Sequence, residues 1–242
     1  MYVRCAACPL RLKPVFVQKT EQEVALIEEW KSDHLRLSEG TEFIHPDQSR
    51  SELYTLFAGW AYRYKELSDG RRQILNFVLP GDLIGLQSSM FGKSFYGAVA
   101  LTDVELCQLP RRKFRRLFER MPELAYDVTW LGSRSESVVD ENLLTAGRRG
   151  AAEKIAALFA SLYKRAETLG LLVDGVLEMP LTQQHIADAL GLSLVHTNKT
   201  LAKLRAQNLF TLAEGQLVVK NLRSMSRLAQ HFEEDIAPRP II

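Results

Sequence analysis

The sequence predicts an α+β protein with an N-terminal β jelly roll, a long dimerisation helix and a C-terminal winged helix-turn-helix. Short apolar runs separated by turn residues recur from about 35 to 110, and a helical pattern follows. Two short helical segments joined by a glycine turn then occupy 181–209. At 242 residues, of which 46% are hydrophobic, the chain can bury the cores of two domains.

Four segments follow from these patterns. They are an N-terminal cysteine-containing segment (1–22), the β-roll sensor domain (23–112), the dimerisation helix (113–146) and the winged helix-turn-helix (147–242). Neither the N-terminus nor any later stretch has an apolar run of membrane-spanning length, so we expect a soluble, cytoplasmic protein with no membrane partner. Three cysteines, an odd number, indicate a reducing compartment rather than a disulfide framework.

The β region consists of short alternating or apolar runs. They are Leu35 to Ile44, Leu53 to Tyr64, Gln73 to Leu79, Gly97 to Leu101 and Val104 to Leu109. Turn signals such as Ser68-Asp69-Gly70 and Pro80-Gly81-Asp82 separate them. Regularly spaced short strands of this kind are typical of a sandwich or a jelly roll.

From Arg111 the pattern becomes helical, and one stripe of it has the spacing of a two-stranded coiled coil. The stripe consists of Leu124, Val128, Leu131, Ser135, Val138 and Asn142. It predicts a homodimer whose two polar seam residues lower stability but fix the register. The alternative is a long amphipathic helix that lies on its own β domain. We expect the hinge between the two halves of the chain at 145–150.

The segment 181–209 has the start and stop signals of two helices. Thr182 can accept the free amide hydrogens of a first helix, which Gly191 ends because glycine tolerates a left-handed backbone. Ser193 can cap the second helix. This is the geometry that places a helix in a DNA groove, and the alternative is a plain helical hairpin in an all-α core.

The second helix has an inward and an outward face. Thr197, Leu201 and Leu204 form the inward stripe. The side chains expected to face outward are Val195, Asn198, Lys199 and Ala202. We predict double-stranded DNA as the partner, with phosphate contacts from Thr182, Ser193, His196, Lys199 and Lys203. Gln183 is also expected to bind DNA.

Two apolar strands, Leu209 to Leu212 and Gln216 to Val219, surround Ala213-Glu214-Gly215 and predict a hairpin that completes the winged motif. Charge supports DNA binding only mildly. Residues 147–242 contain twelve Lys or Arg and nine Asp or Glu, a net charge of +3, which leaves −1 for the rest of the +2 chain.

This order of domains resembles the Crp/Fnr superfamily of bacterial transcription regulators, nearer its Fnr and FixK branches than the cyclic-AMP receptor branch. The segments LYTLFAGW at 53–60, DGRRQIL at 69–75 and PGDLIG at 80–85 are similar to the β-roll signatures of that family. The resemblance implies a cytoplasmic homodimer on a two-fold symmetric operator, contact with RNA polymerase, and a sensor that shifts the recognition helices through the hinge.

The β roll departs from the cyclic-AMP receptor branch. That branch has a ribose-binding glutamate after the PGDLIG segment and an arginine for the cyclic phosphate further on. Leu86 stands in the first place here, and 93–98 contains no arginine. A buried phosphate without its arginine is poorly compensated, so we do not expect cyclic AMP. Phe95 and Tyr96 are expected in the core of the roll.

The cysteines resemble part of a metal site. The oxygen-sensing branch holds an iron–sulfur cluster through four cysteines, and Cys5, Cys8 and Cys107 are similar to three of them, with Pro14 where another would be expected. Alternatives are a zinc or disulfide-exchanging pair, or inert thiols. The cofactor and the signal stay unassigned, and haem on His34 or His45 is not expected.

The recognition helix also departs from its relatives, which often carry glutamate and arginine there. Val195 and Lys199 occupy these two positions, and valine cannot accept a hydrogen bond from cytosine. We expect Leu194 or Val195 against a thymine methyl, Asn198 on adenine and Lys199 on guanine or phosphate. The operator should therefore differ from the usual half-site of the family.

Two other classes of function were compared with this one. The sequence shows no nucleophile elbow, phosphate loop, zinc-protease motif or framed carboxylate pair, so we do not expect an enzyme. An interaction protein whose winged domain docks on another protein is the alternative, because the recognition face is weakly charged.

Overall fold

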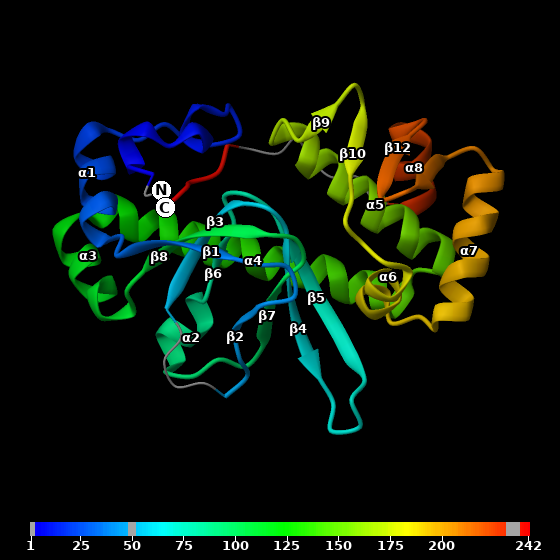
Figure 1. The fold of residues 1–242 in the computed structure, drawn as a ribbon, viewed down its shortest axis with the longest axis horizontal. Coiled ribbons are helices and arrows are strands. Elements are labelled where there is room, and N and C mark those ends of the chain that lie inside the picture. The colour runs from blue at the N-terminus through cyan, green and yellow to red at the C-terminus, as the bar shows by residue number, and fades with distance from the viewer. Residues whose placement is uncertain (1–2, 48–51, 231–237) are drawn as a thin grey trace. The chain divides into compact units, whose positions relative to one another are not determined.

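The structure is a computed structural model that describes residues 3–47, 52–230 and 238–242 (Figure 1). The chain divides into two compact units. The first comprises Met1–Lys65, Asn76–Ser137 and Ala237–Ile242, and the second comprises Glu66–Leu75 and Val138–Ile236. No helix among the described residues is both long and apolar enough to span a membrane.

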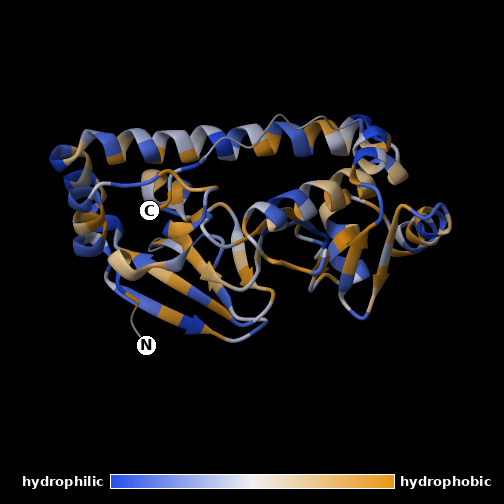
Figure 2. Cartoon of the chain, turned by 90° about the horizontal axis from the view of Figure 1, so that it is seen from above, coloured by the Kyte–Doolittle hydropathy of each residue, from blue (hydrophilic) through white to orange (hydrophobic). Residues whose placement is uncertain are grey.

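The described part of the first unit is built on two four-stranded sheets, with strand orders β1-β8-β3-β6 and β2-β7-β4-β5. The first sheet contains β1 (Asp33–Leu37), β3 (Leu53–Ala58), β6 (Leu83–Ile84) and β8 (Val104–Leu109). The second contains β2 (Glu42–Ile44), β4 (Ala61–Glu66), β5 (Arg72–Val78) and β7 (Gly97–Ala100). Figure 2 shows hydrophobic residues, in orange, along these strands. The two sheets together form the expected β roll.

The two longest predicted runs are each split into two strands. Leu35 to Ile44 divides at Gly40, and Leu53 to Tyr64 divides at Gly59. Gly59 has a φ of +83°, and an added Cβ would lie 2.2 Å from the carbonyl oxygen of Asp103. The chain therefore turns sharply at a position that only glycine fits, and an apolar run alone does not reveal the turn.

Helices close the first unit. They are the 3-10 segments η1 (Cys5–Ala7), η2 (Pro9–Leu12) and η3 (Arg111–Lys113), with α1 (Glu21–Trp30), α2 (Leu86–Phe91) and α3 (Phe114–Arg120). Helix α1 was not predicted from the sequence. Its signal was the capping box in which the Thr20 hydroxyl accepts from the Glu23 amide and the Glu23 carboxylate accepts from the Thr20 amide.

The long helix α4 spans Pro122–Arg148, so the region predicted as one helix from Arg111 is interrupted before Pro122, which cannot donate an amide hydrogen bond. Leu124, Val128 and Leu131 are buried in a core that includes Trp30. They cannot also form a seam with a second chain. The predicted dimer stripe is wrong for these three residues, and the alternative of a helix on its own domain holds there.

The rest of the predicted stripe makes contacts within the chain or is exposed. The Ser135 hydroxyl donates to the Leu131 carbonyl, and the Asn142 side-chain amide donates to the Leu75 carbonyl at 2.8 Å. Both side chains are exposed, and Val138 is half-buried. The polar pair predicted to fix the register of a dimer therefore bonds to its own chain.

The described second unit contains the helices α5 (Ala151–Thr168), α6 (Gln183–Leu190), α7 (Leu194–Ala206) and α8 (Leu222–Ala229). Its strands are β9 (Leu172–Val173), β10 (Val176–Glu178), β11 (Phe210–Ala213) and β12 (Gln216–Val219), in the sheet order β11-β12-β10-β9. Within the predicted hinge, 145–148 is still helical and only Arg149 and Gly150 leave the helix. The Arg149 guanidinium donates to the carbonyl oxygen of Ala229 and to the carboxylate of Glu141. The joint is therefore short, and it is hydrogen-bonded to α4 and α8.

Candidate nucleic-acid interface

The first helix of the motif begins with a complete cap. The Thr182 hydroxyl accepts from the His185 amide at 3.1 Å, and His185 Nδ1 accepts from the Thr182 amide at 3.2 Å. Histidine thus takes the place that glutamate or glutamine usually occupies in a capping box. The Thr182 cap predicted from sequence is confirmed, and it fixes where α6 starts.

The turn between the helices is the predicted one. Gly191 has φ of +63° and ψ of 38°, the left-handed conformation that ends α6. The Ser193 hydroxyl then accepts from the His196 amide at 3.2 Å and caps α7. Both caps and the glycine come from local sequence, so the angle between the two helices is set by three short-range interactions.

The inward stripe of α7 is confirmed. Thr197, Leu201 and Leu204 are 0%, 2% and 1% exposed. They share the interior of the second unit with Phe159 and Phe210, whose rings meet edge to face at 4.9 Å between centroids. The buried stripe therefore packs one face of α7 into the core of the second unit and leaves the other face exposed.

The outward face of α7 is exposed at its N-terminal end. Val195 is 64% exposed and Leu194 is 42% exposed. The other predicted contact residues that are exposed are Thr182, Gln183, Ser193, His196, Lys199 and Lys203. Asn198 departs from expectation, because it is half-buried and its side-chain oxygen has no hydrogen-bond partner among the described residues. Its predicted outward orientation is therefore only partly correct.

The local charge of α7 is more favourable than that of the whole unit. The helix contains Lys199, Lys203 and Arg205 and no Asp or Glu, and all three cations are exposed. A helix with this charge presents only positive side chains to a phosphate backbone.

The wing is present. β11 (Phe210–Ala213) pairs with β12 (Gln216–Val219), and the turn residues Glu214 and Gly215 have φ of +52° and +76°. Positive φ at both turn residues gives the tight hairpin that the glycine predicted. A second hairpin was missed: β9 (Leu172–Val173) and β10 (Val176–Glu178) join through Asp174-Gly175, a turn signal present in the sequence.

Comparison with known proteins agrees with this geometry. Residues 34–121 match the cyclic nucleotide-binding domain family, and 153–228 match the Crp-like helix-turn-helix domain family. The transcriptional activatory protein AadR of Rhodopseudomonas palustris is 30% identical over 82% of each chain. The chain belongs to the Crp/Fnr family of transcription regulators.

Other members of the Crp/Fnr family are also similar. The nitrogen fixation regulation protein FixK of Azorhizobium caulinodans is 31% identical over 77% of this chain and 75% of the relative. The solved structure of FixK2 from Bradyrhizobium japonicum superimposes with a TM-score of 0.74 at 25% identity, over 84% of this chain and 98% of that one. The similarity to FixK proteins covers both domains.

The PGDLIG segment of this β roll is hydrogen-bonded to a buried tyrosine. The amide of Gly85, the last residue of the PGDLIG segment, donates to the Tyr96 hydroxyl at 2.9 Å. The Tyr96 ring is 2% exposed and stacks under the Arg63 guanidinium at 4.0 Å. Tyr96 is therefore in the core as expected, whereas Phe95 is 43% exposed, and that expectation was wrong.

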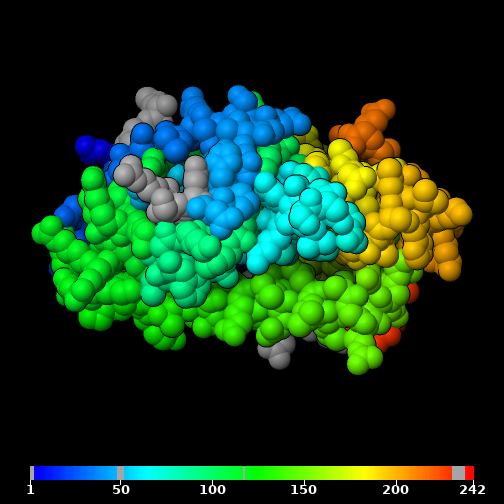
Figure 3. Space-filling view, turned by 90° about the horizontal axis from the view of Figure 1, so that it is seen from below, coloured from blue at the N-terminus to red at the C-terminus, as the bar shows by residue number. Residues whose placement is uncertain are grey.

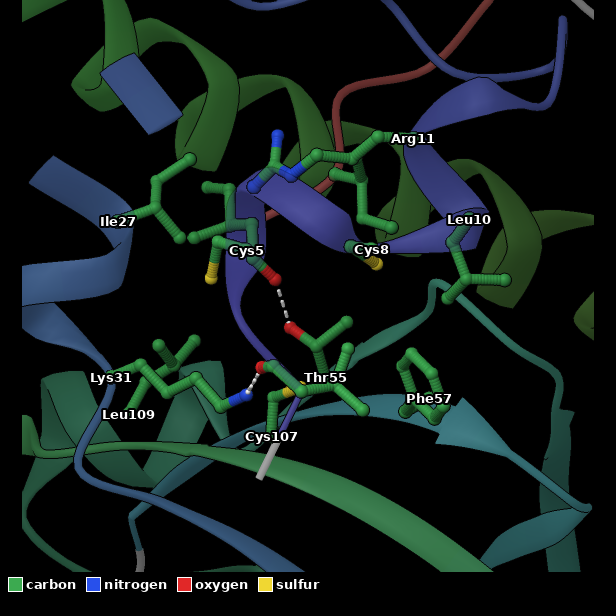
Figure 4. A pocket seen from close by; sticks show the side chains of 13 residues that line it. Cys5, Cys8, Leu10, Arg11, Ile27, Lys31, Thr55, Phe57, Cys107 and Leu109 are labelled. Atoms are coloured by element: carbon green, nitrogen blue, oxygen red, sulfur yellow. Dashed lines mark hydrogen bonds between the residues drawn. The ribbon is translucent and has the colours of Figure 1, made fainter. Parts of the chain in front are cut away.

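The three cysteines line one pocket of the first unit (Figure 4). Cys5 lies in η1, Cys8 lies between η1 and η2, and Cys107 lies in β8. Burial, reinforced by the carboxylate of Glu28, raises the pKa of the Cys5 thiol to about 12, and burial also raises the pKa of Cys107. The three cysteines thus lie close together in space, as their resemblance to one site predicted.

The donor set in this pocket is three thiols, one short of the four cysteines that hold an iron–sulfur cluster in the oxygen-sensing branch, so no cluster is assigned to it. Among the residues that the structure describes, no three His, Cys, Asp or Glu side chains converge as metal ligands do. The His34 imidazole lies 2.6 Å from the Glu105 carboxylate.

The back of α7 offers a test of its packing. The buried Thr197 hydroxyl has no hydrogen-bond partner among the described residues, whereas the Thr200 hydroxyl donates to the His196 carbonyl at 2.8 Å. We predict that Thr197→Val raises the free energy of unfolding by about 1 kcal/mol, because it removes an unpaired buried polar group. Thr200→Val is the matched control. It removes a hydroxyl that already has a hydrogen bond, so the free energy of unfolding should stay the same or fall. Urea unfolding measures both, and a loss of stability in Thr197→Val alone contradicts this packing.

Proposed function

We propose that this chain is a sequence-specific transcription regulator that binds a two-fold symmetric operator as a homodimer. The observation that carries the proposal is the geometry of α7: its back is buried, its start is capped by Ser193, and its N-terminal side chains are exposed. Relatives named as transcriptional activators support the same function. As an activator, the dimer would also contact RNA polymerase.

The proposed DNA contacts are assigned to the α7 side chains that are exposed to solvent. Leu194 and Val195 are the exposed apolar residues of α7, and we assign them to thymine methyl groups in the major groove. Lys199 and Lys203 lie one helical turn apart on the exposed side, where they would meet guanine or phosphate. Asn198 would reach an adenine only after its half-buried side chain turns outward.

The dimer interface is proposed on a different face of α4 from the one that the sequence predicted. Exposed or half-buried residues of this helix recur at alternating steps of three and four: Thr129, Gly132, Glu136, Val139, Leu143 and Ala146. Val139 and Leu143 are 53% and 70% exposed, which is unusual for large aliphatic side chains unless a partner covers them. Figure 3 shows α4, in green, uncovered along one edge.

The route by which a signal would reach α7 is proposed within the second unit. Arg72, just after the hairpin turn of β4 and β5, pairs with Asp188 of α6 at 2.8 Å. Gln73 donates to the Ala189 carbonyl at 2.9 Å. We propose that this hairpin and the joint at Arg149-Gly150 together bias α6 and α7 toward or away from operator spacing.

A binding-site selection tests the assignment of Val195. We predict that wild type selects a half-site with thymine opposite Val195. Val195→Glu should shift this one position toward cytosine, because the glutamate carboxylate can accept a hydrogen bond from the cytosine amino group. The change should be worth about 1–3 kcal/mol at that base pair. Recovery of the same half-site by both proteins, with equal preference at every position, contradicts the assignment.

The dimer face is tested by a charge on α4. We predict that Leu143→Arg sediments as a monomer, because a buried unpaired arginine in the seam opposes association. Ser137→Arg places the same charge on an exposed position outside the proposed seam and should remain dimeric. Analytical ultracentrifugation separates these outcomes. A dimeric Leu143→Arg protein would place the interface elsewhere.

A further inference from the structure

The last residues of the chain return to the first unit. Residues 138–236 belong to the second unit, yet Ala237–Ile242 belong to the first. In Figure 1 this segment, in red, lies beside the N-terminal segment, in blue. Ile241 and Ile242 are 3% and 5% exposed. A short segment that buries two aliphatic side chains after leaving another unit is docked rather than loose.

Arg239 anchors this segment through its backbone and its side chain. Its amide donates to the Val15 carbonyl and its carbonyl accepts from the Val17 amide, each at 2.9 Å, which forms a parallel bridge with Phe16. The guanidinium pairs with the Asp82 carboxylate and lies 5.1 Å from the centre of the Phe16 ring. The Arg239 and Asp82 side chains are 14% and 15% exposed, so the ion pair is largely shielded from water.

The docked segment reaches the cysteine pocket. Ile241 and Ile242 line this pocket together with the three cysteines. The Thr55 hydroxyl donates to the Ile242 carbonyl, as one dashed line in Figure 4 shows. Thr55 and Cys107 are direct partners across β3 and β8, so their side chains lie on the same face, about 4.5–5.5 Å apart. The carbonyl end of Ile242 is therefore held next to the Cys107 thiol.

The pocket also carries positive charge beside the thiols. Arg11 and Lys31 line it, and Arg11 has one guanidinium nitrogen that is buried with no partner among the described residues. The Lys31 ammonium donates to the Val3 carbonyl at 2.7 Å. Arg11 and Lys31 act to lower the pKa of the Cys5 and Cys107 thiols, whereas burial, the larger effect, raises it.

We propose that residues 238–242 form a tethered plug that shields the three thiols of this pocket, with Arg239 as its anchor. The tether makes docking intramolecular, so a modest interface is enough to keep the plug in place. Release exposes Cys107 and Cys8 to electrophiles without unfolding the β roll. Access to these thiols is therefore controlled by a segment that follows the DNA-binding domain in the chain.

Alkylation of the reduced full-length protein by N-ethylmaleimide tests the plug, with labelling of each cysteine followed by peptide mass spectrometry. We expect Arg239→Ala to label Cys107 and Cys8 at least about tenfold faster than wild type, because reaction through local opening follows the population of the open form. Arg115→Ala removes an exposed ion pair with Glu119 elsewhere in the same unit and should label like wild type.

A second variant keeps the test decisive. Ile242→Ser leaves the Arg239 anchor intact but removes the aliphatic side chain that fills the pocket, and it should also accelerate labelling of Cys107. Circular dichroism and operator binding check that each variant is folded. If Arg239→Ala is not folded, Ile242→Ser alone decides. Folded variants that label at the wild-type rate overturn the proposal.

Discussion

The left-handed backbone of Gly191 is the constraint on which the DNA-facing surface depends. At a φ of +63° a side chain with a Cβ costs roughly 1–2 kcal/mol, so glycine fixes where α6 ends. Ser193 is then held at the start of α7 and fixes which residues turn inward. A helix that started one residue later would be rotated by about 100°, which would displace the Thr197, Leu201 and Leu204 stripe from the core. The exposed position of Val195 thus follows from one glycine and one cap.

Helix α4 meets two packing demands on adjacent faces, because the buried stripe and the proposed seam are offset by one residue, a rotation of about 100°. Leu124, Val128 and Leu131 pack in the core of the first unit. Val139 and Leu143 are exposed in the single chain and would be buried in the proposed dimer. Because both faces belong to one helix, any rotation of α4 that changes the dimer seam also disturbs the sensor core. In the proposed dimer, this coupling would carry a signal between the β roll and the operator.

Local sequence predicted what local interactions determine. The caps at Thr182 and Ser193, the turn at Gly191 and the wing at Glu214-Gly215 involve residues close together in the chain. The register of α4 could not be predicted in this way, because its buried and exposed stripes share the same three-and-four spacing. Only contacts with distant residues such as Trp30 decide which stripe is core. The docking of residues 238–242 could not be predicted for the same reason, because Arg239 and Asp82 are 157 residues apart in the sequence.

The most direct test of the account is the salt dependence of binding to the selected duplex. We predict that affinity for wild type falls steeply as salt rises, and that Lys199→Ala lowers affinity and reduces the slope of log K against log salt by about 0.9 per half-site. Lys93→Ala, a matched loss of charge in the first unit, should keep the wild-type slope. Two results would contradict recognition of DNA through this face of α7 and favour docking on a protein. One is an affinity that does not change with salt concentration, and the other is a Lys199→Ala protein with the affinity and slope of wild type.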